Sequence, residues 1–171
     1  MEPRISVSTT ICPHEDSERV VESVRSIFPE WNPEQIPSSC LFPSDRDVVK
    51  ISAEVDSLEG LLSIVRENRV LDTALDAMAM DSEEDYAAFS ISRQSASVGK
   101  ISFVLDKWTF GGSIDVILVG SEVRLWLEQH TWHRGREGIP RSIGDDNSMT
   151  ELGEPSEWFD QNGRRMMGES N

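Results

Sequence analysis

Cysteine and lysine are scarce in this sequence, and long apolar runs are missing. Its 171 residues include two cysteines and three lysines. Cys12 and Cys40 are too few for a disulfide scaffold, and we expect them to be buried thiols rather than a bridge. No stretch without a charged residue is longer than that from Ile5 to His14, which is about half of the roughly 20 residues that a membrane-spanning helix needs. The sequence therefore predicts no transmembrane segment.

Motifs that mark common enzyme sites are also missing. The sequence has no Gly-x-Ser-x-Gly, phosphate loop or dinucleotide fingerprint. The Cys12-Pro-His14 segment and the pair His130 and His133 do not supply the four convergent ligands of a structural zinc site. The opening Met-Glu-Pro-Arg lacks the apolar stretch of a secretory signal. We therefore expect a cytoplasmic protein without an active site, a metal or a cofactor.

Acidic side chains outnumber basic ones throughout the chain. The 31 acidic and 16 basic residues give a net charge of −15. Residues 1–120 contain 21 acidic and 10 basic side chains, so the excess is not confined to a tail. Such self-repulsion is tolerable in molar salt, where the Debye length is about 3 Å. We expect a surface adapted to a high-salt cytoplasm, and an acidic mesophilic protein is the alternative.

Apolar periodicity predicts an α+β fold. Alternating apolar residues predict strands within residues 4–11, 49–55, 87–91, 101–105 and 114–118. Helical spacing predicts helices within residues 17–28, 57–65, 70–78 and 121–130, and residues 81–85 are expected to form an acidic turn. The order β-α-β-α-α-β-β-β-α favours a largely antiparallel sheet with helices packed on one face. We expect one domain over residues 1–133 and a largely disordered acidic tail over residues 134–171, which are rich in Gly, Ser and charge.

Two groups of basic and polar residues stand out against this acidic background. Arg66 and Arg69 lie at the junction of the two middle helices, and residues 92–100 form a polar link, predicted to be flexible, between two strands. Arg, Gln and Ser side chains and exposed backbone amides commonly contact phosphate and sugar. The alternative is an ordinary solvated surface on which Arg66 pairs with nearby carboxylates. Composition alone favours that alternative.

Four segments between residues 4 and 133 carry a family resemblance. They are Ile5–Ile11 with the following Pro13-His-Glu-Asp16, Arg66–Ala74, Phe89–Phe103 and Gly112–Ile114. In order and spacing these segments resemble a family of archaeal proteins described as predicted RNA-binding, exosome-subunit-like proteins. That family commonly shows Asn-Lys where this chain has Ser92-Arg93, and it has Ala in place of Ser95. Arginine in place of lysine keeps the charge and favours bidentate phosphate contact.

This resemblance implies a fold and a function. The implied fold is similar to that of the large-subunit ribosomal protein that binds 5S rRNA, and the resemblance also implies a homodimer. The implied function is that of a non-catalytic RNA-binding protein, accessory to RNA processing or ribosome biology, although function inferred from fold is analogy. The expected RNA contacts are Arg93, Gln94 and Lys100, which we predict to be the most exposed, supported by Arg66 and Arg69.

A different class of function is the alternative. A protein–protein adaptor or a homodimer without nucleic acid would use the sheet or the final helix as its interface. Trp126 and Trp132 are the expected anchors of such an interface, because tryptophan is enriched among residues that dominate binding energy.

Overall fold

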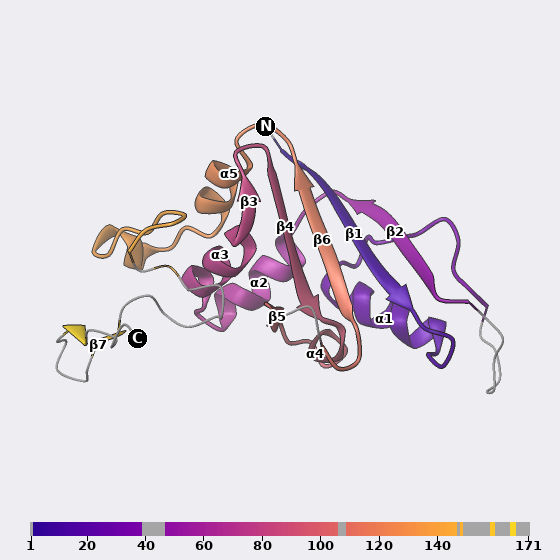
Figure 1. Cartoon of the computed structure of the whole chain (residues 1–171). Coiled ribbons are helices and arrows are strands. Elements are labelled where there is room, and N and C mark those ends of the chain that lie inside the picture. The colour runs from indigo at the N-terminus through magenta and orange to yellow at the C-terminus, as the bar shows by residue number, and fades with distance from the viewer. Residues whose placement is uncertain are drawn as a thin grey trace, which may run out of the picture.

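A six-stranded antiparallel sheet with helices against one face forms the body of the protein (Figure 1). The computed structural model describes residues 2–38, 47–105, 109–146, 148, 158–159 and 165–166. The elements in chain order are β1 (Arg4–Ile11), α1 (Ser17–Ile27), β2 (Val49–Val55), α2 (Glu59–Glu67), α3 (Leu71–Ala79), β3 (Asp81–Glu83), β4 (Tyr86–Ser92), α4 (Arg93–Ala96), β5 (Phe103–Val104), β6 (Ser113–Val119), α5 (Val123–His130), the 3₁₀ helix η1 (Arg134–Glu137), β7 (Trp158–Phe159) and β8 (Arg165–Met166).

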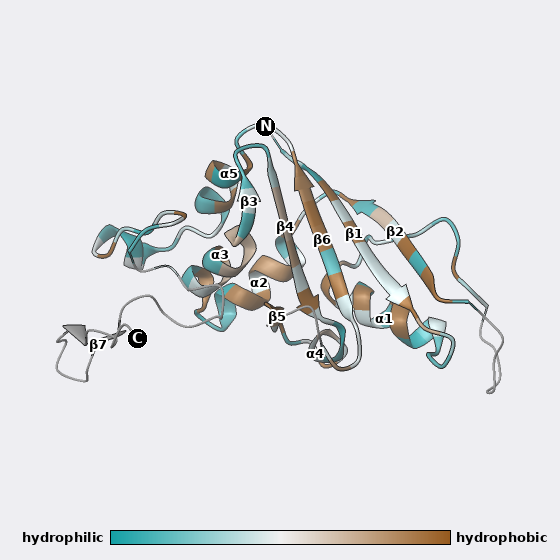
Figure 2. Cartoon of the chain, viewed as in Figure 1, coloured by the Kyte–Doolittle hydropathy of each residue, from teal (hydrophilic) through white to brown (hydrophobic). Residues whose placement is uncertain are grey.

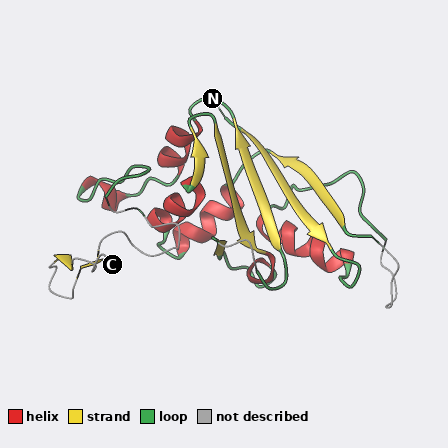
Figure 3. Cartoon of the chain, in the orientation of Figure 1, coloured by secondary structure: helices red, strands yellow, loops and turns green. Residues whose placement is uncertain are grey.

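The strand order pairs the first strand of the chain, β1, with the late strand β6. The strands run β2-β1-β6-β4-β3, and β5 pairs with the outer edge of β4. Strand β6 lies between β1 and β4, and Val116 is opposite both Val7 and Phe89. Because side chains alternate along a strand, the apolar residues of these three strands share the face that meets the helices. Figure 3 shows α1 and α2 behind the sheet.

Local sequence explains why the first helix begins and packs where it does. The Asp16 side chain caps α1 by accepting a hydrogen bond from the Glu18 N–H at 3.0 Å. After α1, the fully buried Trp31 donates its indole N–H to the Val7 carbonyl at 2.8 Å. This bond satisfies the polar atom of a large core side chain and fixes the chain against β1.

The predicted fold class is confirmed, with local differences. The acidic segment 81–85 begins with strand β3, because residues 81–83 pair with β4. The strand predicted over residues 101–105 is reduced to Phe103–Val104. The link 92–100 contains helix α4, capped by the Ser92 side chain, and is not an irregular segment. In the described residues, no helix is long and apolar enough to cross a membrane.

The boundary predicted at residue 133 lies inside the packed structure. Residues 134–146 include η1, the buried Arg136, and Ile143, which packs against the core. Composition suggested disorder because glycine, proline and charge replace the apolar pattern here, but long-range ion pairs hold this segment. Cys12 is half-buried. Cys40 and most of the predicted tail beyond Asp146 lie outside the described residues.

Candidate nucleic-acid interface

Helix α2 ends in a backbone turn centred on Arg69. The Arg69 N–H donates to the Arg66 carbonyl at 3.1 Å, and the Val70 N–H donates to the Val65 carbonyl at 3.2 Å. These two bonds define the Schellman motif, in which the residue after the helix cap is left-handed. Arg69 accordingly has a φ of 57°. Glycine is the usual residue at this position because it has no Cβ to clash with the backbone.

Helix α4 ends in the same motif with the usual glycine. The Gly99 N–H donates to the Ala96 carbonyl at 2.9 Å, and the Lys100 N–H donates to the Ser95 carbonyl at 3.0 Å. Gly99 has a φ of 72°. Lys100 leaves this turn exposed to solvent. The chain therefore uses one turn twice, with glycine in one copy and arginine in the other.

The two turns border one apolar cavity of about 290 Å³. Arg69 lies between Asn68 and Val70, which both line the cavity, and Lys100 directly precedes the lining residue Ile101. The other lining residues come from α2, α3 and the β5 segment: Val65, Thr73, Ala74, Ala77, Phe103 and Leu105. The fold thus brings the backbone turns that contain Arg69 and Lys100, which are distant in sequence, to one cavity.

The three exposed cations of this region differ in their partners. The Arg66 Nη1 lies 3.1 Å from Glu59 Oε1, so the ion-pair alternative applies to Arg66. An exposed pair of this kind contributes little and exchanges easily. For Arg69 and Lys100, the part of the chain that the structure describes supplies no ion pair. Their positive charges are therefore available to an external anion.

Arg93 is not an exposed contact, which corrects the prediction from sequence. Its side chain is 4% exposed and forms an ion pair with Glu15 through Nη2. Its Nη1 donates to Thr9 Oγ1 at 2.8 Å and to the Thr10 carbonyl at 2.7 Å. A Cβ on Gly112 would lie 2.5 Å from Nη2, so glycine makes room for the guanidinium. Arg93 therefore ties α4 to the end of β1.

Gln94 is exposed as predicted, but it lies in different surroundings. It packs beside Gly111, and with Arg93 it lines a hollow that also includes Phe110. None of these residues lines the cavity beside Arg69. Of the predicted RNA contacts, Arg69 and Lys100 thus lie in the two turns that border this cavity, Arg66 precedes the first of these turns, and Arg93 and Gln94 lie elsewhere.

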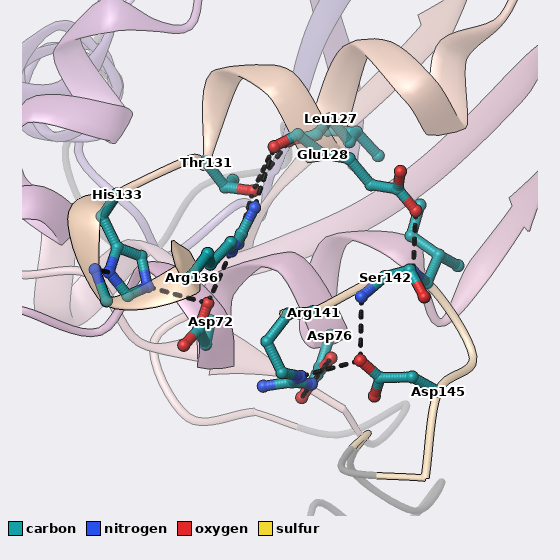
Figure 4. Close-up of polar contacts among 12 residues, drawn as sticks. Asp72, Asp76, Leu127, Glu128, Thr131, His133, Arg136, Arg141, Ser142 and Asp145 are labelled. Carbon is teal, nitrogen blue, oxygen red and sulfur yellow. Dashed lines mark hydrogen bonds and ion pairs between the residues drawn. The ribbon is translucent and has the colours of Figure 1, made fainter. Parts of the chain in front are cut away.

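A second polar cluster, which sequence reasoning missed, ties the C-terminal segment to α3 (Figure 4). Asp72 Oδ1 accepts hydrogen bonds from Arg136 Nε and from His133 Nε2, both at 2.9 Å. One turn along α3, Asp76 accepts from Arg141 Nη2 at 2.7 and 2.8 Å. The spacing of the aspartates at i and i+4 was the available signal, because it places both on one helix face.

Electrostatics in this cluster favours the charged forms. Burial raises the pKa of Asp72, but hydrogen bonds from His133 and Arg136 and their positive charges outweigh it, so that pKa lies below its ordinary value. Burial likewise raises the pKa of Asp145, and hydrogen bonds from the Ser142 backbone and from Arg141 lower it overall. The cluster is therefore structural, and its lowered pKa values keep the Asp72 and Asp145 carboxylates ionised at neutral pH.

The histidine and tryptophan side chains named as candidates from the sequence lie in different surroundings. His130 stacks on Trp126 with ring centroids 3.9 Å apart, whereas His133 bonds Asp72. Trp126 is 7% exposed and donates its indole N–H to Glu2, so its expected role as an interface anchor is wrong. Trp132 remains 53% exposed. Among the described residues, no group of three or more His, Cys, Asp or Glu side chains is arranged to hold a metal.

Comparison with known proteins gives a consistent group of relatives. The chain is 33% identical over 145 residues to a UPF0201 protein of Aeropyrum pernix, covering 82% of this chain and 93% of the relative. It is 29% identical over 104 residues to a UPF0201 protein of Sulfurisphaera tokodaii, covering 61% of this chain and 69% of the relative. No family model matches the sequence.

Solved structures show the same fold. The crystal structure of the Methanococcus jannaschii UPF0201 protein superposes with a TM-score of 0.61 at 20% identity, covering 75% of this chain and 99% of that one. Another UPF0201 crystal structure gives a TM-score of 0.59 at 22% identity, covering 73% of this chain and 90% of that one. At these identities the structural likeness supports the fold alone.

Proposed function

The chain belongs to the UPF0201 family of archaeal proteins, and we propose that it is a non-catalytic RNA-binding protein. Arg69 and Lys100 are the contacts to the RNA backbone, supported by Arg66. Guanidinium and ammonium groups at exposed turns are suited to phosphate oxygens. Arg93 contributes indirectly, by holding α4 against the end of β1.

The observation that carries this proposal is the arginine at a position suited to glycine. A non-glycine residue in the left-handed region costs roughly 1 kcal/mol or more. Gly99 shows that the same turn in this chain is made without that cost. A backbone outlier of this kind supports a functional role for the side chain, here a cation in one of the two turns that border the cavity.

The acidic background makes the proposed contact local. A net charge of −15 repels phosphate at long range, so diffusional steering cannot supply the affinity. Short hydrogen-bonded contacts from a guanidinium survive salt that screens the long-range repulsion. Binding should therefore be modest in affinity and confined to the surface around Arg69 and Lys100.

Fluorescence anisotropy with a labelled single-stranded RNA 12-mer tests the proposal. We expect Arg69→Ala with Lys100→Ala to weaken binding about tenfold or more, taking roughly 1 kcal/mol per lost charged contact. The slope of log affinity against log salt should decrease by about 0.7 for each lost phosphate contact. Arg124→Ala, an exposed arginine on α5, is the matched control. Absence of binding by the wild type at every salt concentration that keeps it folded would contradict the proposal.

The exposed face of the sheet favours a second candidate, self-association. Within the described residues, no helix covers the face opposite α1 and α2 (Figure 1). Alternation along the central strands places on that face Arg4, Ser6, Ser8, Thr10, Tyr86, Ala88, Ser90, Ser92, Ser113, Asp115, Ile117 and Val119. The charged members of this set are Arg4, at the start of β1, and Asp115, whose Oδ1 accepts from the Ser90 hydroxyl at 2.6 Å. Figure 2 shows β1 mostly in the pale colours of intermediate hydropathy.

Depletion of charge is typical of the centre of a protein–protein interface. A second copy of this chain, packed face to face across the sheet, would bury this surface. Sedimentation velocity measurements on Ile117→Lys would detect the loss of a dimer. Leu125→Lys, which changes an exposed apolar residue of α5, is the control. A wild type that is monomeric at high protein concentration excludes this candidate.

A further inference from the structure

We infer that the cavity between α2, α3 and the β5 segment receives one unstacked nucleobase of single-stranded RNA. This inference rests on the proposed function and names the form of RNA that the site takes. At about 290 Å³, the cavity is slightly smaller than the roughly 300–1,000 Å³ typical of ligand pockets. That size suits a single ring system.

The cavity has the chemistry of a base-binding pocket. Its described lining contains no charged side chain, and Phe103 supplies an aromatic wall. The Phe103 ring is held against Phe89, with centroids 5.9 Å apart and an interplanar angle of 60°. Asn68 and Thr73 add an amide and a hydroxyl that can bond the polar edge of a base. Aromatic stacking combined with edge hydrogen bonds is how proteins bind unstacked RNA bases.

The mouth of the cavity indicates why the occupant is a nucleotide. Val70 is 42% exposed and Thr73 is exposed, so the cavity opens to solvent beside α3. Arg69 and Lys100 are exposed and directly neighbour lining residues in the sequence. A nucleotide combines a flat, largely apolar ring with an attached anion, which matches an apolar cavity beside two cations. An uncharged apolar peptide would leave both cations without a partner.

A variant that fills the cavity distinguishes the contribution of the RNA base to affinity from that of the RNA backbone. Ala77 is buried and lines the cavity from the middle of α3, so Ala77→Leu projects into the space while keeping a strong helix former. Thr73→Leu narrows the mouth from an exposed position and is the second variant if Ala77→Leu fails to fold. Lys100→Ala removes a backbone contact and leaves the cavity lining unchanged.

The probes are a fluorescein-labelled single-stranded RNA of twelve adenosines and the same ribose-phosphate backbone without bases. We expect the wild type to bind the adenosine oligomer about tenfold more tightly than the abasic one, as one stacked base contributes. Ala77→Leu and Thr73→Leu should abolish this preference and leave abasic binding unchanged. Lys100→Ala should weaken binding of both oligomers and keep the preference.

Three results would overturn the inference. If the filled variants bind the adenosine oligomer as tightly as the wild type, the cavity takes no base, although the proposed function stands. If the wild type binds neither oligomer, the proposed function fails and the inference with it. If decanoate shifts the Ala77 methyl resonance in NMR titrations and adenosine monophosphate does not, the cavity accepts apolar chains and not bases.

Discussion

Arg136 donates from Nε to Asp72 Oδ1 at 2.9 Å and thereby ties the segment after α5 to helix α3. The same guanidinium donates to the Glu128 carbonyl at 2.8 Å and to the Thr131 hydroxyl at 3.0 Å. One side chain thus joins the end of α5, the start of α3 and the C-terminal segment. Its side chain is 5% exposed, whereas that of Asp72 is 34% exposed.

Removal of this guanidinium should destabilise the whole domain. We expect Arg136→Ala to lower the free energy of unfolding by about 2–3 kcal/mol, below the usual cost of breaking a buried pair because solvent screens Asp72. Arg134→Ala, two residues earlier and exposed, should change it by less than about 0.5 kcal/mol. Urea unfolding followed by circular dichroism measures both. Equal stability of the two variants would show that the segment does not pack in solution.

The free energy of unfolding should decrease in acid, partly because Asp72 becomes protonated. The pKa of Asp72 is lowered in the folded state, so its contribution is present above the unfolded pKa of about 3.9 and is lost as pH falls through the folded pKa. The difference in unfolding free energy between the wild type and Asp72→Asn should therefore be largest above about pH 5 and should shrink below that. Urea titrations from pH 7 to pH 3 measure this difference. A constant difference would contradict the assignment.

Arg93 should behave as a residue of the core. We expect Arg93→Ala to lower the free energy of unfolding by about 3 kcal/mol, because Glu15 loses its partner and a buried guanidinium site is left empty. Gln94→Ala, its exposed neighbour, should have little effect on stability. Thermal melts of both variants compare them directly. An unchanged melting temperature for Arg93→Ala would restore the prediction of an exposed RNA contact.

Salt should stabilise the fold. Sixteen basic residues do not balance 31 acidic ones, and molar potassium chloride screens the resulting repulsion over about 3 Å. The buried pair Arg141–Asp76 is screened much less and should persist. We therefore expect a higher melting temperature in molar salt than in dilute buffer. A melting temperature that is equal or higher in dilute buffer would contradict the expected adaptation to high salt.

Periodicity was enough to predict the main elements of the fold. Alternation at Ile5, Val7, Thr9 and Ile11 predicted β1, and its inward residues are buried as expected. Short or polar elements were harder to predict. Strand β3 forms because residues 81–83 have a partner in β4, a pairing that no local pattern indicates. Element type could thus be predicted where one face is apolar, but not where pairing alone decides it.

The candidate site could be predicted only in part. Composition identified Arg69 and Lys100, but it did not distinguish them from Arg93, whose burial depends on Glu15 in a distant loop. The cavity depends on tertiary packing of three segments, which no local spacing encodes. The positive φ of Arg69 is likewise visible only in the structure, because arginine is an unusual residue for that conformation.

Arg69 is the residue most directly responsible for the proposed RNA binding, and Arg69→Gly tests this role most sharply. Glycine relieves the left-handed backbone, so the free energy of unfolding should stay constant or rise by up to about 1 kcal/mol. The affinity for single-stranded RNA should nevertheless fall about fivefold or more, the equivalent of roughly 1 kcal/mol for the lost charged contact. We therefore predict a variant that folds as well as the wild type and binds RNA more weakly. A variant that binds RNA as tightly as the wild type would contradict the account.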